Sequence, residues 1–265
     1  MSVHRIYDPD LPSDLPIGSA YVITGDEASH GVLVKRLRVG EEVEIVSGGG
    51  IVARGEIAEV HRKPARMVVR VRLVEVFAER SCSVVVASAI PKGGRSDVMV
   101  DQLSQVGVTR WVPMLTARGV VDPREGKLEK WRRAAVESMK QSGRRFVMEI
   151  GDSATFADIL QRSLLLPRHV LILAHQDGVL FYKGPVDLLS QRLGDCCEMD
   201  AGECGDQFVG NIMVLVGPEG GFTPDEIDRA CQLPYGADLV SFSPHTLRIE
   251  TAAVVAAGMV TCQVL

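Results

Sequence analysis

The chain has 265 residues, of which 46% are hydrophobic and 24% are charged, and its formal net charge at pH 7 is −5. This composition is typical of a globular protein and excludes an intrinsically disordered chain. The first residues, MSVHRIYDPDLP, lack the apolar core of a signal peptide, and the longest apolar runs fall far short of the roughly 20 residues of a membrane span. We therefore expect a cytoplasmic protein without membrane association.

Charge is distributed unevenly along the chain. Residues 151–240 contain 14 acidic and 5 basic residues, whereas residues 118–149 contain 9 basic and 5 acidic ones. The stretch VHRKPARMVVRVRL, at 60–73, has five basic residues and no acidic residue. The overall negative charge therefore does not exclude RNA as a partner, although most basic runs are simply solvated faces.

The six cysteines, at positions 82, 196, 197, 204, 231 and 262, lack the paired CxxC spacing of a zinc site. Three of them lie in the acidic stretch GDCCEMDAGECGDQ, which we interpret as a solvated loop. We therefore expect reduced thiols and no bound metal.

Short alternating stretches characterise the first 76 residues. SAYVITG, EEVEIVS, IVARGEIAEV and RMVVRVRLVE each favour a strand, because apolar residues at every second position share one face. The apolar residues expected on such faces are Val43, Ile45, Met67, Val69, Val71 and Leu73. The glycines of SGGGI, at 47–51, predict a hairpin turn, and DEASHGVLVKRLRVG predicts a short helix. We predict a small β-barrel or sandwich over residues 1–76.

Strands and helices alternate from about residue 82. The strands are SVVVAS, RWVPML, FVMEI, HVLILA, IMVLVG and DLVSF, and helices are expected near 96–106, 126–142 and 154–164, from 224, and from about 250. Continuous apolar strands separated by helices predict an α/β domain, over residues 77–265, with a mainly parallel sheet and helices on both faces. The last helix, TAAVVAAGMVTC, is apolar on every side and should be buried within the domain or in a subunit interface.

The stretch LVGPEGGFTPDEID, at 215–228, joins an apolar strand to a helix through a glycine-rich turn. Thr223 and Glu226 have the spacing of a capping box with Pro224 at the first helical position, so a helix begins here. Glycines allow a ligand to approach the backbone, but neither GxxxxGK[ST] nor GxGxxG is present. The pattern alone favours a ligand-binding loop over a plain tight turn.

A second loop, in FSPHTLRIETAA at 242–253, has the same order of strand, polar turn and helix. Arg248 and Glu250 lie at the start of an apolar helix, where a charged side chain costs free energy unless it has a partner or a function. Either the two residues form a salt bridge at the helix N-terminus or they have a catalytic role.

Together, these two loops resemble those of the bacterial 16S ribosomal RNA uracil-N3 methyltransferases, the ribosomal RNA small subunit methyltransferase E family of the SPOUT class. The similarity extends over nearly the whole chain, through His30, Arg36 and Gly40, AIPKGGR at 89–95, VGVTRWVPMLTAR at 106–118, and KQSGR at 140–144. The chain departs from the family's usual pattern at Asp101, Gln102, Gln105, Ala117 and Ser47. These departures affect the expected contacts with RNA more than the two loops.

The resemblance implies an N-terminal PUA-like RNA-binding barrel and a C-terminal SPOUT domain whose backbone forms a trefoil knot. It implies S-adenosylmethionine as cofactor, 16S ribosomal RNA or the small ribosomal subunit as partner, and a homodimer. The cofactor-binding residues that it implies are Ala174, His175, Val216, Gly217, Pro218, Glu219, Gly220, Gly221, Phe242, Ser243, Leu247, Arg248 and Ile249. The RNA-binding residues are expected to be His30, Arg36, Arg38, Lys92, Arg95, Arg118, Gln141 and Arg144.

Methylation of uracil N3 requires removal of a proton and stabilisation of an anion. We expect Arg248 to stabilise the charge, and Glu250, or a water that it orients, to accept the proton. Two alternatives remain open at this stage: a SPOUT methyltransferase acting on another RNA, and an RNA-binding ribosome assembly factor without catalysis.

Overall fold

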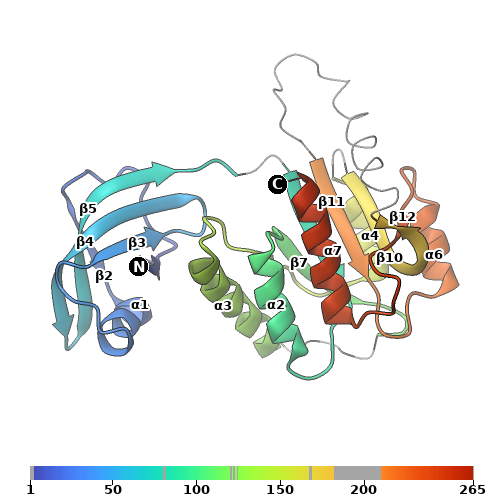
Figure 1. Cartoon of the computed structure of the whole chain (residues 1–265), viewed down its shortest axis with the longest axis horizontal. Helices are drawn as coiled ribbons and strands as arrows, with labels where there is room; N and C mark the ends of the chain where they lie inside the picture. The colour runs from blue at the N-terminus through green and yellow to red at the C-terminus, as the bar shows by residue number, and fades with distance from the viewer. Residues whose placement is uncertain are drawn as a thin grey trace, which may run out of the picture. The chain divides into compact units, whose positions relative to one another are not determined.

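The computed structural model describes residues 3–79, 82–119, 121, 123, 125–166, 169–181 and 210–264 (Figure 1). Met1–Glu79 with Val136–Val147 forms a first compact unit, and Arg80–Ala135 with Met148–Leu265 forms a second. The acidic segment 195–206, with its three cysteines, lies outside the described residues. Within the described ranges, no helix is long and apolar enough to cross a membrane.

The first unit contains a five-stranded sheet in the order β1-β3-β4-β5-β2. β1 (His4–Tyr7) is parallel to β3 (Glu42–Val46), and β3, β4 (Ile51–Arg62), β5 (Ala65–Val76) and β2 (Ala20–Ile23) pair antiparallel. The four strands predicted here are confirmed, and the glycine turn at 47–51 joins β3 to β4. β1 was not predicted, because only Ile6 of its four residues is buried and a single buried position shows no periodicity.

Alternating residues of these strands form the core of the first unit. Val43, Ile45, Met67, Val69 and Val71 are buried as predicted. The placement of Leu73 on this face was wrong, since its side chain is 38% exposed. The register of β5 against β4 shifts between Arg54 and Gly55, and such a bulge transfers the following residues to the opposite face.

The predicted short helix is confirmed as α1 (Gly25–Ser29), followed directly by a π-helical turn, η1 (His30–Val34). Ala28 and Val32 pack into the core of the sheet. Arg36 follows with a φ of 57°, a left-handed conformation that is unusual outside glycine.

The end of α3 (Glu125–Ser142) belongs to the first unit. Met139 packs with Val46 and Val52, and the Nζ atom of Lys140 lies 2.7 Å from Glu27 Oε1. The helix stops before Gly143, whose φ of 80° fits the predicted helix end.

The second unit contains a parallel sheet in the order β12-β10-β11-β6-β7-β8, with β9 (Ala154–Thr155) also pairing with β7. Its strands are β6 (Cys82–Ser88), β7 (Arg110–Leu115), β8 (Glu149–Ile150), β10 (His169–Leu180), β11 (Gly210–Val216) and β12 (Asp238–Ser241). All pairs within this sheet are parallel, as the alternation of apolar strands and helices predicted.

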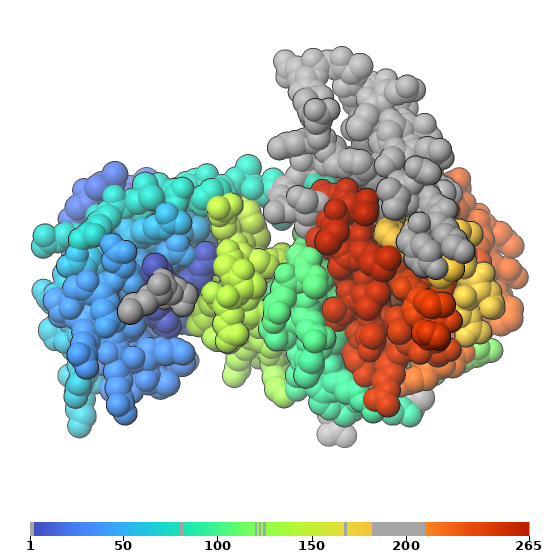
Figure 2. Space-filling view, in the orientation of Figure 1, coloured from blue at the N-terminus to red at the C-terminus, as the bar shows by residue number. Residues whose placement is uncertain are grey.

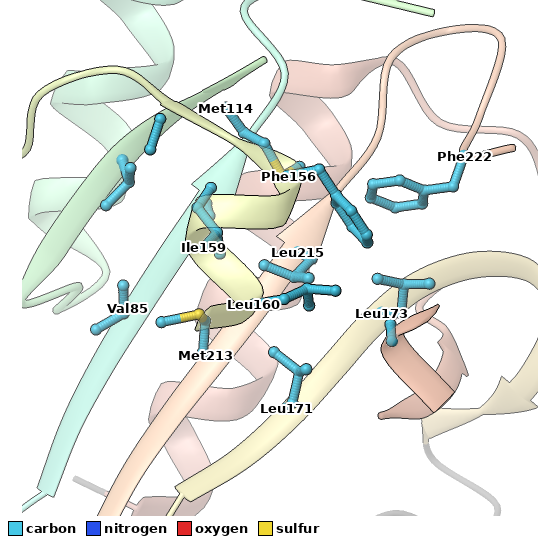
Figure 3. Packing of buried hydrophobic residues seen from close by; sticks show 14 residues of the cluster. Val85, Met114, Phe156, Ile159, Leu160, Leu171, Leu173, Met213, Leu215 and Phe222 are labelled. Carbon is cyan, nitrogen blue, oxygen red and sulfur yellow. The ribbon is translucent and has the colours of Figure 1, made fainter. Parts of the chain in front are cut away.

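Helices cover both faces of this sheet. α4 (Phe156–Ser163) and α6 (Pro224–Cys231) bury apolar side chains against one face, where Leu171, Leu173, Met213 and Leu215 point toward them (Figure 3). α7 (Ile249–Val264) contacts β6, β11 and α2 (Arg95–Gln105) and covers the other face (Figure 1). Because both faces are covered, the middle parts of the strands, such as VVVA in β6 and IMVLV in β11, are continuously apolar. The trefoil knot stays a prediction.

Candidate functional site

Two strands of the second unit, β11 and β12, end on either side of β10. Ala174 of β10 is in register with Val216 of β11 on one side and with Val240 of β12 on the other. The loops that follow β11 and β12 therefore leave the same edge of the sheet, the carboxyl edge at which α/β proteins bind their ligands.

The turn after β11 is compact. The amide of Gly221 donates a 2.8 Å hydrogen bond to the carbonyl of Pro218, and Gly221 has a φ of 65°. The ring of Phe222 lies beneath Gly217 and packs against Phe156, with ring centroids 5.3 Å apart, so the turn is anchored in the core. A Cβ atom on Gly217 would lie 3.1 Å from the Phe222 ring, which explains why a residue without a side chain occupies this position.

The predicted capping box at the start of α6 is confirmed. The hydroxyl of Thr223 accepts a 3.2 Å hydrogen bond from the amide of Glu226, and the Thr223 amide donates to Glu226 Oε2 at 2.8 Å. Pro224 stands at the first helical position, and Glu226 is buried. These bonds fix where the turn ends and the helix begins.

A cavity of about 430 Å³ lies at this edge. All thirteen residues expected to bind the cofactor line it, although they come from three segments separated in the sequence. Two more lining residues, His245 and Thr246, fall within the loop from Phe242 to Ile249 that was expected to bind the cofactor, and five others were not predicted: Gln176, Phe222, Val240, Ser241 and Ala252. Each is within three residues of an expected one, so extending the expected loops would have found them.

Arg118 also lines this cavity, although it follows β7 and was expected to bind RNA. Its Nη1 atom donates to the carbonyls of Gly220, at 2.5 Å, and Phe222, at 3.2 Å. The structure therefore places this guanidinium against the glycine turn.

The two expected catalytic residues have different surroundings. Arg248 is exposed and lines the cavity, and within the described part of the chain its side chain has no hydrogen-bond or ion-pair partner. Glu250 does not line the cavity; its Oε1 atom lies 3.7 Å from Arg95 Nε. The ion-pair partner of Glu250 is thus Arg95, and the alternative of a structural Arg248–Glu250 salt bridge was wrong.

The residues expected to bind RNA are divided between the two units. His30, Arg36, Arg38, Gln141 and Arg144 belong to the first unit, and Lys92, Arg95 and Arg118 belong to the second. In the first unit, the ring of His30 stacks on His4, with centroids 6.4 Å apart. Burial, followed by the positive charges of Lys35 and Lys140, lowers the pKa of His4. Glu27 acts in the opposite direction on His4, and it is also the ion-pair partner of Lys140.

Comparison with known proteins identifies the class of protein. Residues 78–261 match the family model of the RNA methyltransferase domain, and residues 23–69 match that of the RNA methyltransferase PUA domain. The chain belongs to this RNA methyltransferase family.

Individual relatives within that class share one name. Proteins named ribosomal RNA small subunit methyltransferase E are similar to this chain: that of Mycobacterium bovis is 29% identical, over 92% of this chain and 86% of the relative, and that of Bacillus subtilis is 26% identical, over 92% and 90%. The resemblance inferred from the two loops is thereby confirmed.

The fold agrees with that of a solved relative. The crystal structure of a ribosomal RNA small subunit methyltransferase E from Neisseria gonorrhoeae, bound to S-adenosyl methionine, superimposes with a TM-score of 0.77 over 99% of this chain and 98% of that chain. At 20% identity, this likeness establishes the fold.

Proposed function

We propose that the protein transfers a methyl group from S-adenosylmethionine to N3 of a uridine in the 16S ribosomal RNA of the small subunit. The observation that supports this proposal best is the gathering of all thirteen expected cofactor residues around one cavity at the carboxyl edge of a parallel sheet. The names of the curated relatives, and the cofactor in the related crystal structure, support the same activity.

The cavity suits S-adenosylmethionine in size and chemistry. Its volume of about 430 Å³ falls within the range of roughly 300–1,000 Å³ for small-molecule sites. Gly217, Gly220 and Gly221 present bare backbone on one wall, and Phe242 and Leu247 give apolar surface to the loop after β12. Backbone amides and carbonyls at such a wall can bind the edge of an adenine, and apolar side chains can pack on its face.

The residues of the chain must bind the reactants, stabilise the negative charge of the uracil anion and accept the proton from N3. When bound, S-adenosylmethionine supplies an electrophilic methyl group. Arg248 has the position for stabilising the uracil anion, because its guanidinium borders the cavity without a protein partner in the described residues. Glu250 lies two residues further on and does not line the cavity, so we propose that it accepts the proton through a bridging water.

Methyl-transfer kinetics test the role of Arg248. For Arg248→Gln, we expect kcat to fall by about 10²- to 10³-fold, while the calorimetric Kd for S-adenosylmethionine changes less than the rate. Arg229→Ala, on the exposed side of α6, is the matched control and should retain full activity. An unchanged kcat in Arg248→Gln would contradict this role.

The identity of the substrate requires a separate experiment. Labelled methyl groups should enter small-subunit particles, and neither transfer RNA nor large subunits, and mass mapping should place the label on N3 of one uridine. Labelling of a different RNA would favour the alternative target. Binding of RNA by a wild-type protein that does not bind S-adenosylmethionine would favour an assembly factor.

We also propose that the protein is a homodimer that pairs through α7. One face of this helix is buried against the sheet, whereas its opposite stripe, Thr251, Val255, Gly258, Met259 and Cys262, is partly or fully exposed. Figure 2 shows atoms of α7 at the surface of the second unit. Val255 and Met259 are only partly buried within one chain, and a second subunit could cover them completely. Light scattering should give twice the chain mass for the wild type, and Val255→Glu should give the monomer; a monomeric wild type would contradict the proposal.

A further inference from the structure

The loop that follows β7 is hydrogen-bonded to the glycine turn that follows β11. Arg118 donates from Nη1 to the carbonyls of Gly220 and Phe222, which lie on either side of Gly221. The Cδ atom of Arg118 also lies close to Gly220, where an added Cβ atom would be 3.3 Å away. The side chain therefore contacts the turn through its aliphatic part as well as its charge.

Glu226 makes a second connection between the same two segments. Its Oε1 atom accepts a 3.0 Å hydrogen bond from the amide of Ala117, and its Oε2 atom accepts from the amide and hydroxyl of Thr223, at 2.8 and 3.2 Å. This carboxylate is buried, and three donors from two loops satisfy it. A capping box needs only the bonds to Thr223, so the bond to Ala117 is an additional tie.

A turn with glycines at 217, 220 and 221 needs such external bonds. Glycine has more accessible backbone conformations than any other residue, so a glycine-rich turn loses much entropy when it adopts one shape. Hydrogen bonds to the carbonyls of Gly220 and Phe222 hold the peptide plane between Gly220 and Gly221 and the plane between Phe222 and Thr223, and thereby restrict the backbone of the turn at the cavity wall. Fixing a binding loop in advance increases affinity because less conformational entropy is lost on binding.

We propose that Arg118 and Glu226 are positioning residues that hold the glycine turn in the shape that binds the cofactor. The identity of that cofactor rests on the proposed function. The guanidinium of Arg118 acts on the protein's own carbonyls, and its contribution to cofactor affinity is separate from any contact with an RNA phosphate.

The two roles of Arg118 predict different measurements. A residue that positions the turn affects the Kd for S-adenosylmethionine and leaves RNA affinity unchanged. A phosphate-binding arginine affects RNA affinity and makes its salt dependence shallower, because one fewer counterion is released. Both affinities can be measured on the same variants, by calorimetry with S-adenosylmethionine and by titration of small-subunit particles at two salt concentrations.

For Arg118→Ala, we expect the Kd for S-adenosylmethionine to rise about tenfold, the effect of losing charge-assisted hydrogen bonds, with RNA affinity and its salt dependence unchanged. Arg118→Lys, which keeps the charge but lacks the planar guanidinium, should lie between wild type and Arg118→Ala. Glu226→Gln, which can no longer accept bonds at both ends, should weaken cofactor binding several-fold. Arg229→Ala, an arginine on the same helix as Glu226, should change neither affinity.

Three outcomes would overturn the inference. The first is a Kd for S-adenosylmethionine in Arg118→Ala within twofold of wild type. The second is a loss of RNA affinity with a shallower salt dependence and unchanged cofactor binding, which would make Arg118 a phosphate contact. The third is a wild type that does not bind S-adenosylmethionine, which would refute the proposed function itself. Melting curves establish that each variant is folded at the assay temperature, and Arg118→Lys serves if Arg118→Ala does not fold.

Discussion

Gly178 lies where β10 passes close to the backbone of β12, and we expect that an alanine at this position separates the two strands. The register between them shifts between Ala174 and Val179, which brings Gly178 against Leu239 and Val240. A Cβ atom on Gly178 would lie 2.6 Å from the Leu239 carbonyl carbon and 2.6 Å from the Val240 nitrogen. Both contacts are with backbone atoms, so a side-chain rotation cannot relieve them.

The size of the effect follows from these distances. Ordinary contact begins near 3.4 Å, so β12 would have to move by about 0.8 Å. Overpacking of this kind costs about 1–3 kcal/mol. For a protein of this size, we expect Tm to fall by about 3–10 °C. Because Val240 and Ser241 line the cavity, S-adenosylmethionine should also bind more weakly.

Urea unfolding of Gly178→Ala, followed by circular dichroism, measures the loss of stability, and calorimetry measures the loss of affinity. Gly126→Ala is the matched control: Gly126 lies in the first turn of α3, and nothing is within 4 Å of an added Cβ atom. There, alanine should stabilise the protein by about 0.5–1 kcal/mol. A Gly178→Ala variant that unfolds at the same urea concentration as wild type would refute the argument from backbone contact.

Three further predictions concern the first unit. Lys140→Met should lower the free energy of unfolding by about 1.5–3 kcal/mol, because the Lys140 side chain is only 9% exposed. Lys130→Met, at 66% exposure, should lower it by at most about 1 kcal/mol. Equal losses in urea unfolding would contradict the role of burial. Burial and a hydrogen bond to Asp8 raise the pKa of Tyr21 to about 12. The folded protein therefore keeps a proton that the unfolded chain loses above about pH 10, stability falls between these values, and Tyr21→Phe should make that fall shallower in unfolding curves recorded across this range. Arg36→Gly should stabilise the protein by about 1 kcal/mol, because glycine adopts a φ of 57° without strain. The same variant should bind RNA less tightly if Arg36 contacts a phosphate. A less stable Arg36→Gly would show that contacts of the side chain outweigh the backbone strain.

Features that depend on neighbours in the sequence were predictable. The capping box of Thr223 and Glu226, the helix end before Gly143 and the buried residues at alternate positions of β3 and β5 all involve residues within a few positions of each other. Their physical causes, helix capping and side-chain periodicity, act over one or two turns. Even here a bulge between β4 and β5 reversed the direction of Leu73, because register is decided by the pairing of two strands.

Features that depend on distant segments needed the tertiary structure. The sequence indicated two loops with a binding function, but the register of Ala174 with Val216 and Val240 brings their strand ends together. It suggested Arg248 as a partner for Glu250, whereas the fold places Arg95 there. It suggested that Arg118 contacts RNA, which stays a prediction, and the fold adds a hydrogen bond from Arg118 to a carbonyl 102 positions away in the chain.

The class of fold, the family resemblance and most of the loops that line the cavity were thus predictable from the order of the residues. The partners of the charged side chains became known only from the folded chain. The physical reason is that an exposed arginine or glutamate has no local pattern that specifies its contact, whereas apolar periodicity and glycine turns act through the backbone within their own segment.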